Sequence, residues 1–128
     1  MQLSELSFPS VRAELLSYLA GLSDADYQYR AWVEHVLPDA GYDEFNYTVH
    51  FLYDDTGLAE NPCAWIGLVL KNNDEASVVE DVVRAIDVLF EKYGVELSDK
   101  EYLEKKEWQV VMDTAKAALK VLLRDAEI

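Results

Sequence analysis

The residues with the most capacity for chemistry lie in the segment EFNYTVHFLYDDTG, which holds one of the two histidines of the chain. His50 stands four residues before Asp54, and on a helix this spacing places both side chains on one face. An imidazole beside a carboxylate is the beginning of a general base or of a metal site. A working site also needs a nucleophile or at least a third ligand, and His35 supplies one only if the fold brings it near.

Other catalytic and metal-binding signatures are missing from the sequence. The segment DDTGLAEN lacks the alternating Asp or Asn ligands and the final glutamate of a calcium loop. No GxSxG, GxGxxG or P-loop motif occurs. We therefore expect no catalytic residue, no metal and no cofactor, and our hypothesis is that the protein is not an enzyme. The alternative is a small metal-dependent hydrolase that uses His50 and Asp54.

The net charge of −14 is the most unusual property of the chain. Disorder does not explain it, because 51% of the residues are hydrophobic and supply a core. One explanation is solubility, and the other is a basic partner whose encounter with the protein is accelerated by the field. Free nucleic acid and anionic membranes are not expected as partners, because both bind to Lys and Arg.

The acidic residues are concentrated in one stretch. From Ala31 to Leu70 the chain has no Lys or Arg but seven carboxylates, and these are the predicted partner-binding residues: Glu34, Asp39, Asp43, Glu44, Asp54, Asp55 and Glu60. The same stretch holds aromatic residues, which are common anchors of protein interfaces: Trp32, Tyr42, Phe45, Tyr47, Phe51, Tyr53 and Trp65. The other interpretation, a solvated acidic surface over a core, stays open.

The single cysteine and the ends of the chain bear on location. Cys63 lies in the apolar run CAWIGLVL, which predicts a buried and inert thiol and fits a reducing compartment. The first residues contain early acids and no signal-peptide core, and no apolar run approaches the roughly 18 residues of a membrane span. We expect a cytoplasmic protein whose 128 residues form a single helical domain.

Five helices are predicted from apolar periodicity and capping residues. They cover 8–22, 24–36, 74–93, 98–103 and 106–125. Gly94 is the expected end of the third, and Ser98 with Glu101 forms a capping box for the fourth.

The segment 42–72 is ambiguous, since a short apolar run fits both periods. As a helix it would begin at an Asp43 cap and end at Gly57, with Phe45, Val49, Leu52 and Tyr53 facing the core. Asn61 and Pro62 would then open a further buried helix. The alternative is an α+β fold with a hairpin at 45–53 and 64–70 packed on helices. Well-placed caps favour an all-α bundle of about five to seven helices.

Four segments carry a resemblance to known proteins: YQYRAWVEHVLP, YDEFNYTVHFLYDDTGLAENP, IGLVLKNNDEA and EYLEKKEW. Together they resemble a family of small acidic bacterial proteins of undetermined activity, and the likeness covers most of the chain. This resemblance implies a mainly helical fold. In general type, the chain also resembles the immunity proteins of contact-dependent and other polymorphic toxin systems, which are small, acidic, cysteine-poor and without catalytic motifs.

Immunity proteins bind and block a cognate toxin domain, often a basic nuclease, and the resemblance transfers no catalytic residue. Our leading hypothesis is therefore an immunity-type protein whose acidic face covers the substrate cleft of a basic toxin by mimicking phosphate charge. A third hypothesis is a regulatory helical module that self-associates through its Val- and Leu-rich stripes.

Overall fold

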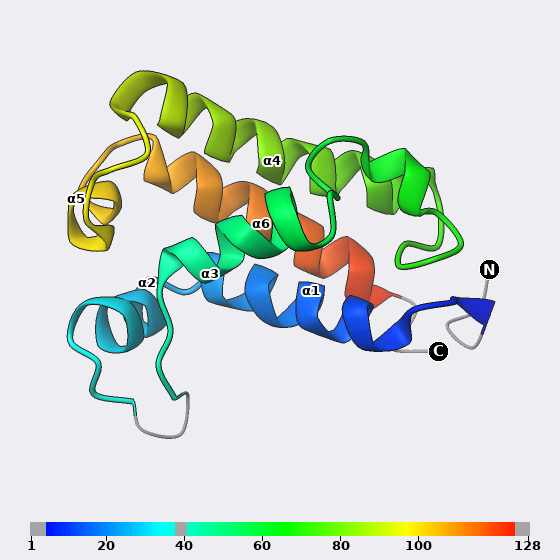
Figure 1. The fold of residues 1–128 in the computed structure, drawn as a ribbon, viewed down its shortest axis with the longest axis horizontal. Coiled ribbons are helices and arrows are strands. Elements are labelled where there is room, and N and C mark those ends of the chain that lie inside the picture. The colour runs from blue at the N-terminus through cyan, green and yellow to red at the C-terminus, as the bar shows by residue number, and fades with distance from the viewer. Residues whose placement is uncertain (1–4, 38–40, 125–128) are drawn as a thin grey trace.

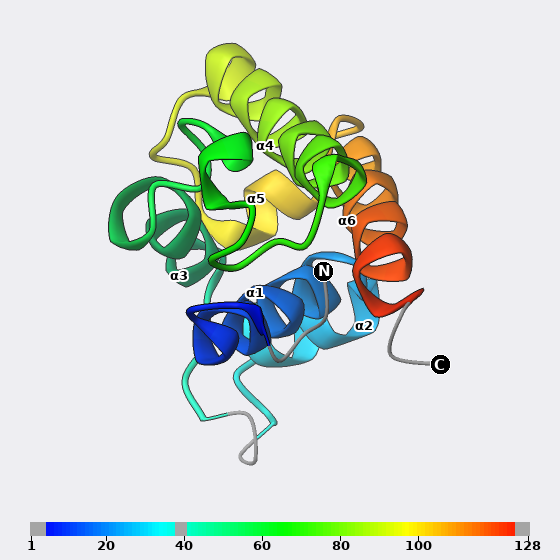
Figure 2. The ribbon, with the colours of Figure 1, turned by 90° about the vertical axis from the view of Figure 1, so that its right-hand side faces the viewer.

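Two long helices form the frame of the molecule. The computed structural model describes residues 5–37 and 41–124, and α4 (Asn73–Tyr93) lies antiparallel beside α6 (Trp108–Leu123). Helix α1 (Pro9–Leu22) packs against α6, and it lies below α6 in Figure 1, whereas Figure 2 shows α1, α4 and α6 at the corners of a triangle. The described parts of the chain contain six α-helices and no strand, so the all-α prediction is confirmed.

Short helices close the bundle at one end. Helix α2 (Ala25–Tyr27) continues directly into a π-helical segment, η2 (Gln28–Val33), and α5 (Asp99–Leu103) packs against η2. The predicted helix over 24–36 ends at Val33, because His35 adopts a left-handed φ of 53° and turns the chain. The N–H of Val36 then bonds the carbonyl oxygen of Arg30 at 2.8 Å, which closes this end.

The ambiguous middle segment is helical. Helix α3 (Phe45–His50) runs without interruption into a π-helical segment, η4 (Phe51–Asp55). Phe45 and Leu52 are buried as the helical reading predicted, and Val49 and Tyr53 are partly buried against the core. The hairpin alternative is wrong. Within the described residues, the only backbone pairing of the β type is one isolated bridge between Ile66 and Leu70.

The segment after Asn61 differs from the prediction. Asn61 and Pro62 do open a helix, but it is a single 3₁₀ turn, η5 (Pro62–Trp65). Gly67 has a φ of 91°, so the chain folds into turns here instead of continuing as a helix. Cys63 is exposed, which corrects the predicted buried thiol, because the short turn buries Pro62 and leaves Cys63 outside.

Local capping signals predicted most of the remaining boundaries. Gly94, with a φ of 78°, ends α4, and the Ser98–Glu101 capping box opens α5. Helix α4 begins one residue earlier than predicted, because the side chain of Asn72 caps it by accepting the N–H of Glu75, at 3.0 Å. No helix in the described part of the chain combines the length and the apolar character needed to cross a bilayer.

Aromatic side chains hold the short helices onto the frame. Phe45 of α3 contacts Trp108 edge-to-face, with ring centroids 4.9 Å apart, and it also meets Phe90 at 6.0 Å and Tyr102 at 5.6 Å. Trp32 of η2 contacts Phe45 at 5.8 Å. Edge-to-face pairs of this kind add to the gain from burial, so the acidic stretch is anchored through its aromatic residues.

Candidate functional site

The histidine and aspartate predicted to share a face do so. His50 Nδ1 lies 2.6 Å from Asp54 Oδ2, and more than half of each side chain is exposed. Among the described residues, no group of three or more His, Cys, Asp or Glu side chains is arranged to hold a metal ion. His35 instead stacks on Tyr42, with ring centroids 5.0 Å apart. Within the described residues, no further His, Cys, Asp or Glu side chain therefore joins the pair to complete a metal site.

The seven predicted partner-binding acids do not form one compact patch. Asp39 lies outside the described residues, and Glu60 lies beside Glu80 and Asp87 of α4. Asp43 and Glu44 precede α3, while Asp54 and Asp55 end η4 at the other end of the same continuous helix. Four of the described six are exposed, namely Glu34, Asp54, Asp55 and Glu60.

Asp43 has a clear internal role. Its Oδ2 accepts hydrogen bonds from the hydroxyl of Tyr27 at 2.5 Å and from Nε1 of Trp32 at 2.9 Å. Its Oδ1 accepts the N–H of Glu44 at 2.9 Å. Burial, followed by this hydrogen bond to Asp43, raises the pKa of Tyr27 well above its usual range. Asp43 thus ties the acidic stretch to α2 and η2, and its carboxylate is held beside the aromatic rings.

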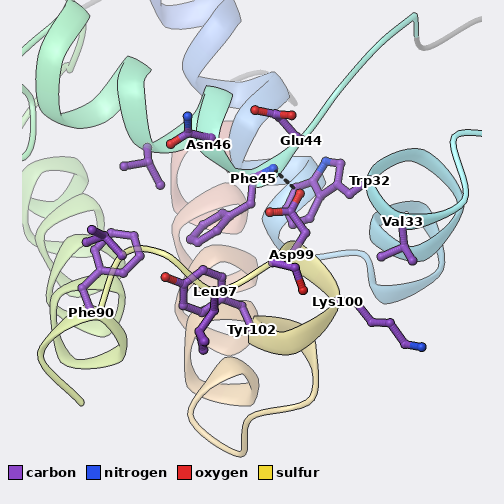
Figure 3. A pocket seen from close by; sticks show the side chains of 13 residues that line it. Trp32, Val33, Glu44, Phe45, Asn46, Phe90, Leu97, Asp99, Lys100 and Tyr102 are labelled. Atoms are coloured by element: carbon purple, nitrogen blue, oxygen red, sulfur yellow. Dashed lines mark hydrogen bonds between the residues drawn. The ribbon is translucent and has the colours of Figure 1, made fainter. Parts of the chain in front are cut away.

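A cavity of about 480 Å³ opens on one side of the segment that begins α3. Figure 3 shows Phe45 at its centre, with Phe90 and Tyr102 on one side and Trp32 on the other. Glu44 and Asp99 add carboxylates, and the ammonium group of Lys100 points away from Asp99 in this view. The lining of the cavity therefore combines aromatic side chains with two carboxylates and one ammonium group.

Asp99 was not among the predicted site residues, yet it is central to this cavity. Its Oδ2 accepts the backbone N–H of Phe45 at 3.0 Å. Burial raises the pKa of Asp99, and the carboxylates of Glu44 and Asp43 raise it further, although the Phe45 N–H acts in the opposite direction. Three carboxylates from two distant parts of the sequence thus gather at the start of α3.

A second depression, of about 280 Å³, lies on the other side of the same segment, between α1, α2 and α3. Its walls carry five aromatic side chains: Tyr18, Tyr27, Trp32, Tyr42 and Tyr47. Glu14 of α1 and Asp43 supply its charges, and no Lys or Arg lines it in the described part of the chain. We call this depression the tyrosine pocket.

Glu14 was also missed by sequence reasoning, because it lies in the mixed polar face of an ordinary amphipathic helix. Burial raises the pKa of Tyr18, and the carboxylates of Glu14, Asp43 and Asp55 add to the effect. Carboxylates from α1, from the start of α3 and from η4 therefore all raise the pKa of the Tyr18 hydroxyl. No local pattern in the sequence marks Glu14 or Asp99, since only the packing of α1 and α5 brings them here.

Comparison with known proteins places the chain in a family. Residues 6–127 match the model of a domain of unknown function, DUF7945, so the chain belongs to this family. No curated protein and no solved structure matches it significantly. The family match agrees with a resemblance to proteins of undetermined activity, and it brings no link to immunity proteins.

Proposed function

We propose that this DUF7945 domain is a non-catalytic protein that binds and neutralises a basic protein domain. The observation that carries the proposal is the grouping of Asp43, Glu44 and Asp99 at the start of α3, between two aromatic-lined hollows. Carboxylates around aromatic side chains are what an interface for a basic surface requires, because the rings supply contact energy and the charges supply complementarity.

The charge of the whole chain supports the same kind of partner. A net charge of −14 creates a field that attracts a basic protein over several ångströms and speeds its encounter. Such steering weakens with salt, because the screening length is only about 8 Å at physiological ionic strength. Binding that is fast at low salt and slow at high salt is therefore part of the proposal.

Within this proposal, the partner is a toxin domain with a basic substrate cleft, and a nuclease has such a cleft. The acidic face would occupy the cleft as a phosphate mimic, in the manner of immunity proteins of contact-dependent and polymorphic toxin systems. The domain would then act in the cytoplasm, where the toxin reaches its substrate. The support for this finer step is the small, acidic, motif-free character of the chain.

The test is a binding measurement with the protein encoded directly upstream, by co-purification and by calorimetry. The first variant reverses one acid from each of the two hollows, Glu44→Lys with Glu14→Lys. The matched control reverses two exposed acids of α4, Asp81→Lys with Glu91→Lys, so that the change in net charge is the same.

We expect the first variant to bind much more weakly, mainly through a slower association, and the control to keep most of the affinity. Equal weakening in both variants would show that only the overall charge matters and would reject this face as the contact surface. Absence of binding to the wild-type protein would reject the upstream gene product as the partner.

A further inference from the structure

We infer that the tyrosine pocket receives a single cationic side chain of the protein partner, an arginine in particular. This inference rests on the proposed function and assigns a place in the partner's surface to one pocket of this chain. Three features of the pocket support the inference: its aromatic lining, its negative charge and its size.

The aromatic side chains that line the tyrosine pocket suit a cation. Tyr42 and Tyr47 are 62% and 41% exposed, and their ring centroids lie 5.9 Å apart in an edge-to-face arrangement. Tyr42 is held by its stack on His35, whose ring plane is 9° from parallel, and by the hydrogen bond from its hydroxyl to Glu44. Tyr27 is fixed by its hydrogen bond to Asp43. Rings held in place around a space attract a cation through their negative faces at little cost in conformational entropy.

The charges in the pocket are of one sign. Asp43 lies in the wall with its oxygens engaged by three donors, so it supplies a fixed negative field. Glu14 is exposed, and its carboxylate makes no hydrogen bond or ion pair with any described residue, which leaves it able to bind a donor. Burial first, and then the carboxylates of Glu14, Asp43 and Asp55, raise the pKa of the Tyr18 hydroxyl, which also lines the pocket. A cation that enters therefore meets rings and carboxylates together.

The size of the pocket sets the scale of the occupant. Its volume of about 280 Å³ lies just below the range of about 300–1,000 Å³ that is usual for ligand sites. A hollow of this size accommodates one side chain rather than a folded segment. Two small polar residues, Ser17 and Thr48, also line it.

Arginine fits the lining better than lysine does. The guanidinium group is planar, so it stacks on a tyrosine face while its edge donates hydrogen bonds to a carboxylate. It is also more weakly hydrated than an ammonium group and loses less on leaving water. The combination of tyrosine faces with the available carboxylate of Glu14 is therefore specific for arginine.

The experiment titrates the isolated protein with three small probes and follows backbone and tyrosine signals by NMR. The probes are N-acetyl-arginine amide, N-acetyl-lysine amide and N-acetyl-norleucine amide, which share a backbone and differ in the side chain. We expect the arginine probe to shift signals of the pocket at the lowest concentration, the lysine probe to bind more weakly, and the norleucine probe to leave the pocket unchanged.

Two variants locate the site. Glu14→Gln removes the available charge, and Tyr47→Leu removes a ring whose hydroxyl makes no hydrogen bond with a described residue. Each variant should bind the arginine probe about threefold to tenfold more weakly than the wild type does, as expected for the loss of one charge or one cation–π contact. The matched controls are Glu91→Gln on α4 and Tyr29→Leu, an exposed tyrosine outside the pocket, and both should bind like the wild type.

The inference is overturned if the norleucine probe shifts the pocket as strongly as the arginine probe, or if the lysine probe binds as tightly. It is also overturned if the arginine shifts spread over all acidic surfaces and ignore the two variants. These measurements need no partner protein, so a failure of the pocket can be told apart from a failure of the proposed function. If the protein binds the arginine probe but not the upstream gene product, the assignment of the pocket stands and that gene product is rejected as the partner.

Discussion

The side chain of Asp99 accepts a hydrogen bond from the backbone N–H of Phe45 at 3.0 Å, across 54 positions of the chain. Glu44, which precedes α3, makes no side-chain cap of its own. The first N–H of α3 is therefore satisfied by a residue of α5, which packs on η2.

The first prediction concerns this distant cap. Asp99→Asn keeps an oxygen acceptor for the Phe45 N–H, whereas Asp99→Ala removes it, and both variants lack the charge. We expect the alanine variant to be less stable than the asparagine variant by about 0.5–2 kcal/mol, the usual value of a helix cap. Urea unfolding at neutral pH measures the difference. Equal stability of the two variants would mean that the Asp99 oxygen contributes nothing to the helix.

The charge of Asp99 gives a second prediction, which concerns pH. Burial and two neighbouring carboxylates raise the pKa of Asp99 in the folded protein above the ordinary 3.8. The folded state thus holds this proton more tightly than the unfolded state, so the stability that Asp99 contributes falls as pH rises from 3.8 through the raised value. Asp99→Asn removes this loss.

Relative to wild type, the Asp99→Asn variant should gain stability as pH rises, because only the wild type acquires the unfavourable charge. Unfolding free energies between about pH 3 and about pH 7 provide the measurement. A difference between the two proteins that does not change with pH would contradict the prediction. Asp113→Asn, at an exposed position of α6, is the control.

Glu107 provides a third prediction with the opposite sign. Hydrogen bonds from Lys92 and then from Tyr93 lower the pKa of Glu107 to about 2. The folded state therefore releases this proton more easily, and the stabilisation is present above pH 4.5, the ordinary value, and is lost as pH falls toward about 2. Glu107→Gln should lower the melting temperature at neutral pH, and the effect should shrink through this acidic window. A constant effect would exclude the charge as its cause.

The boundaries that could be predicted from the sequence are those whose capping groups are local. Ser98 with Glu101, and Gly94, lie next to the helix ends that they set. The start of α3 could not be predicted in this way, because its cap comes from Asp99 while the nearer Asp43 binds Tyr27 and Trp32. Sequence spacing does not show which of two carboxylates reaches an N–H when one of them lies on another helix.

The same limit applies to the candidate site. The acidic stretch and its aromatic residues were visible in the sequence, and the pairing of His50 with Asp54 followed from their spacing. Glu14 joined the tyrosine pocket only through tertiary packing of α1. Cys63 shows the converse, since an apolar neighbourhood in sequence did not reveal which side of a single 3₁₀ turn faces water.

The last prediction concerns a buried ion pair that joins three parts of the fold. Arg12 of α1 donates from Nη1 and Nη2 to the two carboxylate oxygens of Glu75 in α4, at 2.8 and 2.9 Å. It also donates to the carbonyl oxygens of Val69 and Leu122. Arg12 is 4% exposed and Glu75 1%, so solvent cannot replace either partner.

The two losses should therefore not be additive. Arg12→Met leaves the buried Glu75 carboxylate with the ammonium group of Lys71 at 3.6 Å but without its bidentate partner, and loss of one partner of a buried ion pair typically costs about 3–5 kcal/mol. Glu75→Gln keeps an acceptor for the backbone N–H of Lys71, which Glu75 binds at 2.7 Å. In a double-mutant cycle by urea unfolding, the combined variant should lose much less than the sum of the single losses. Simple additivity would show that the two charges do not depend on each other.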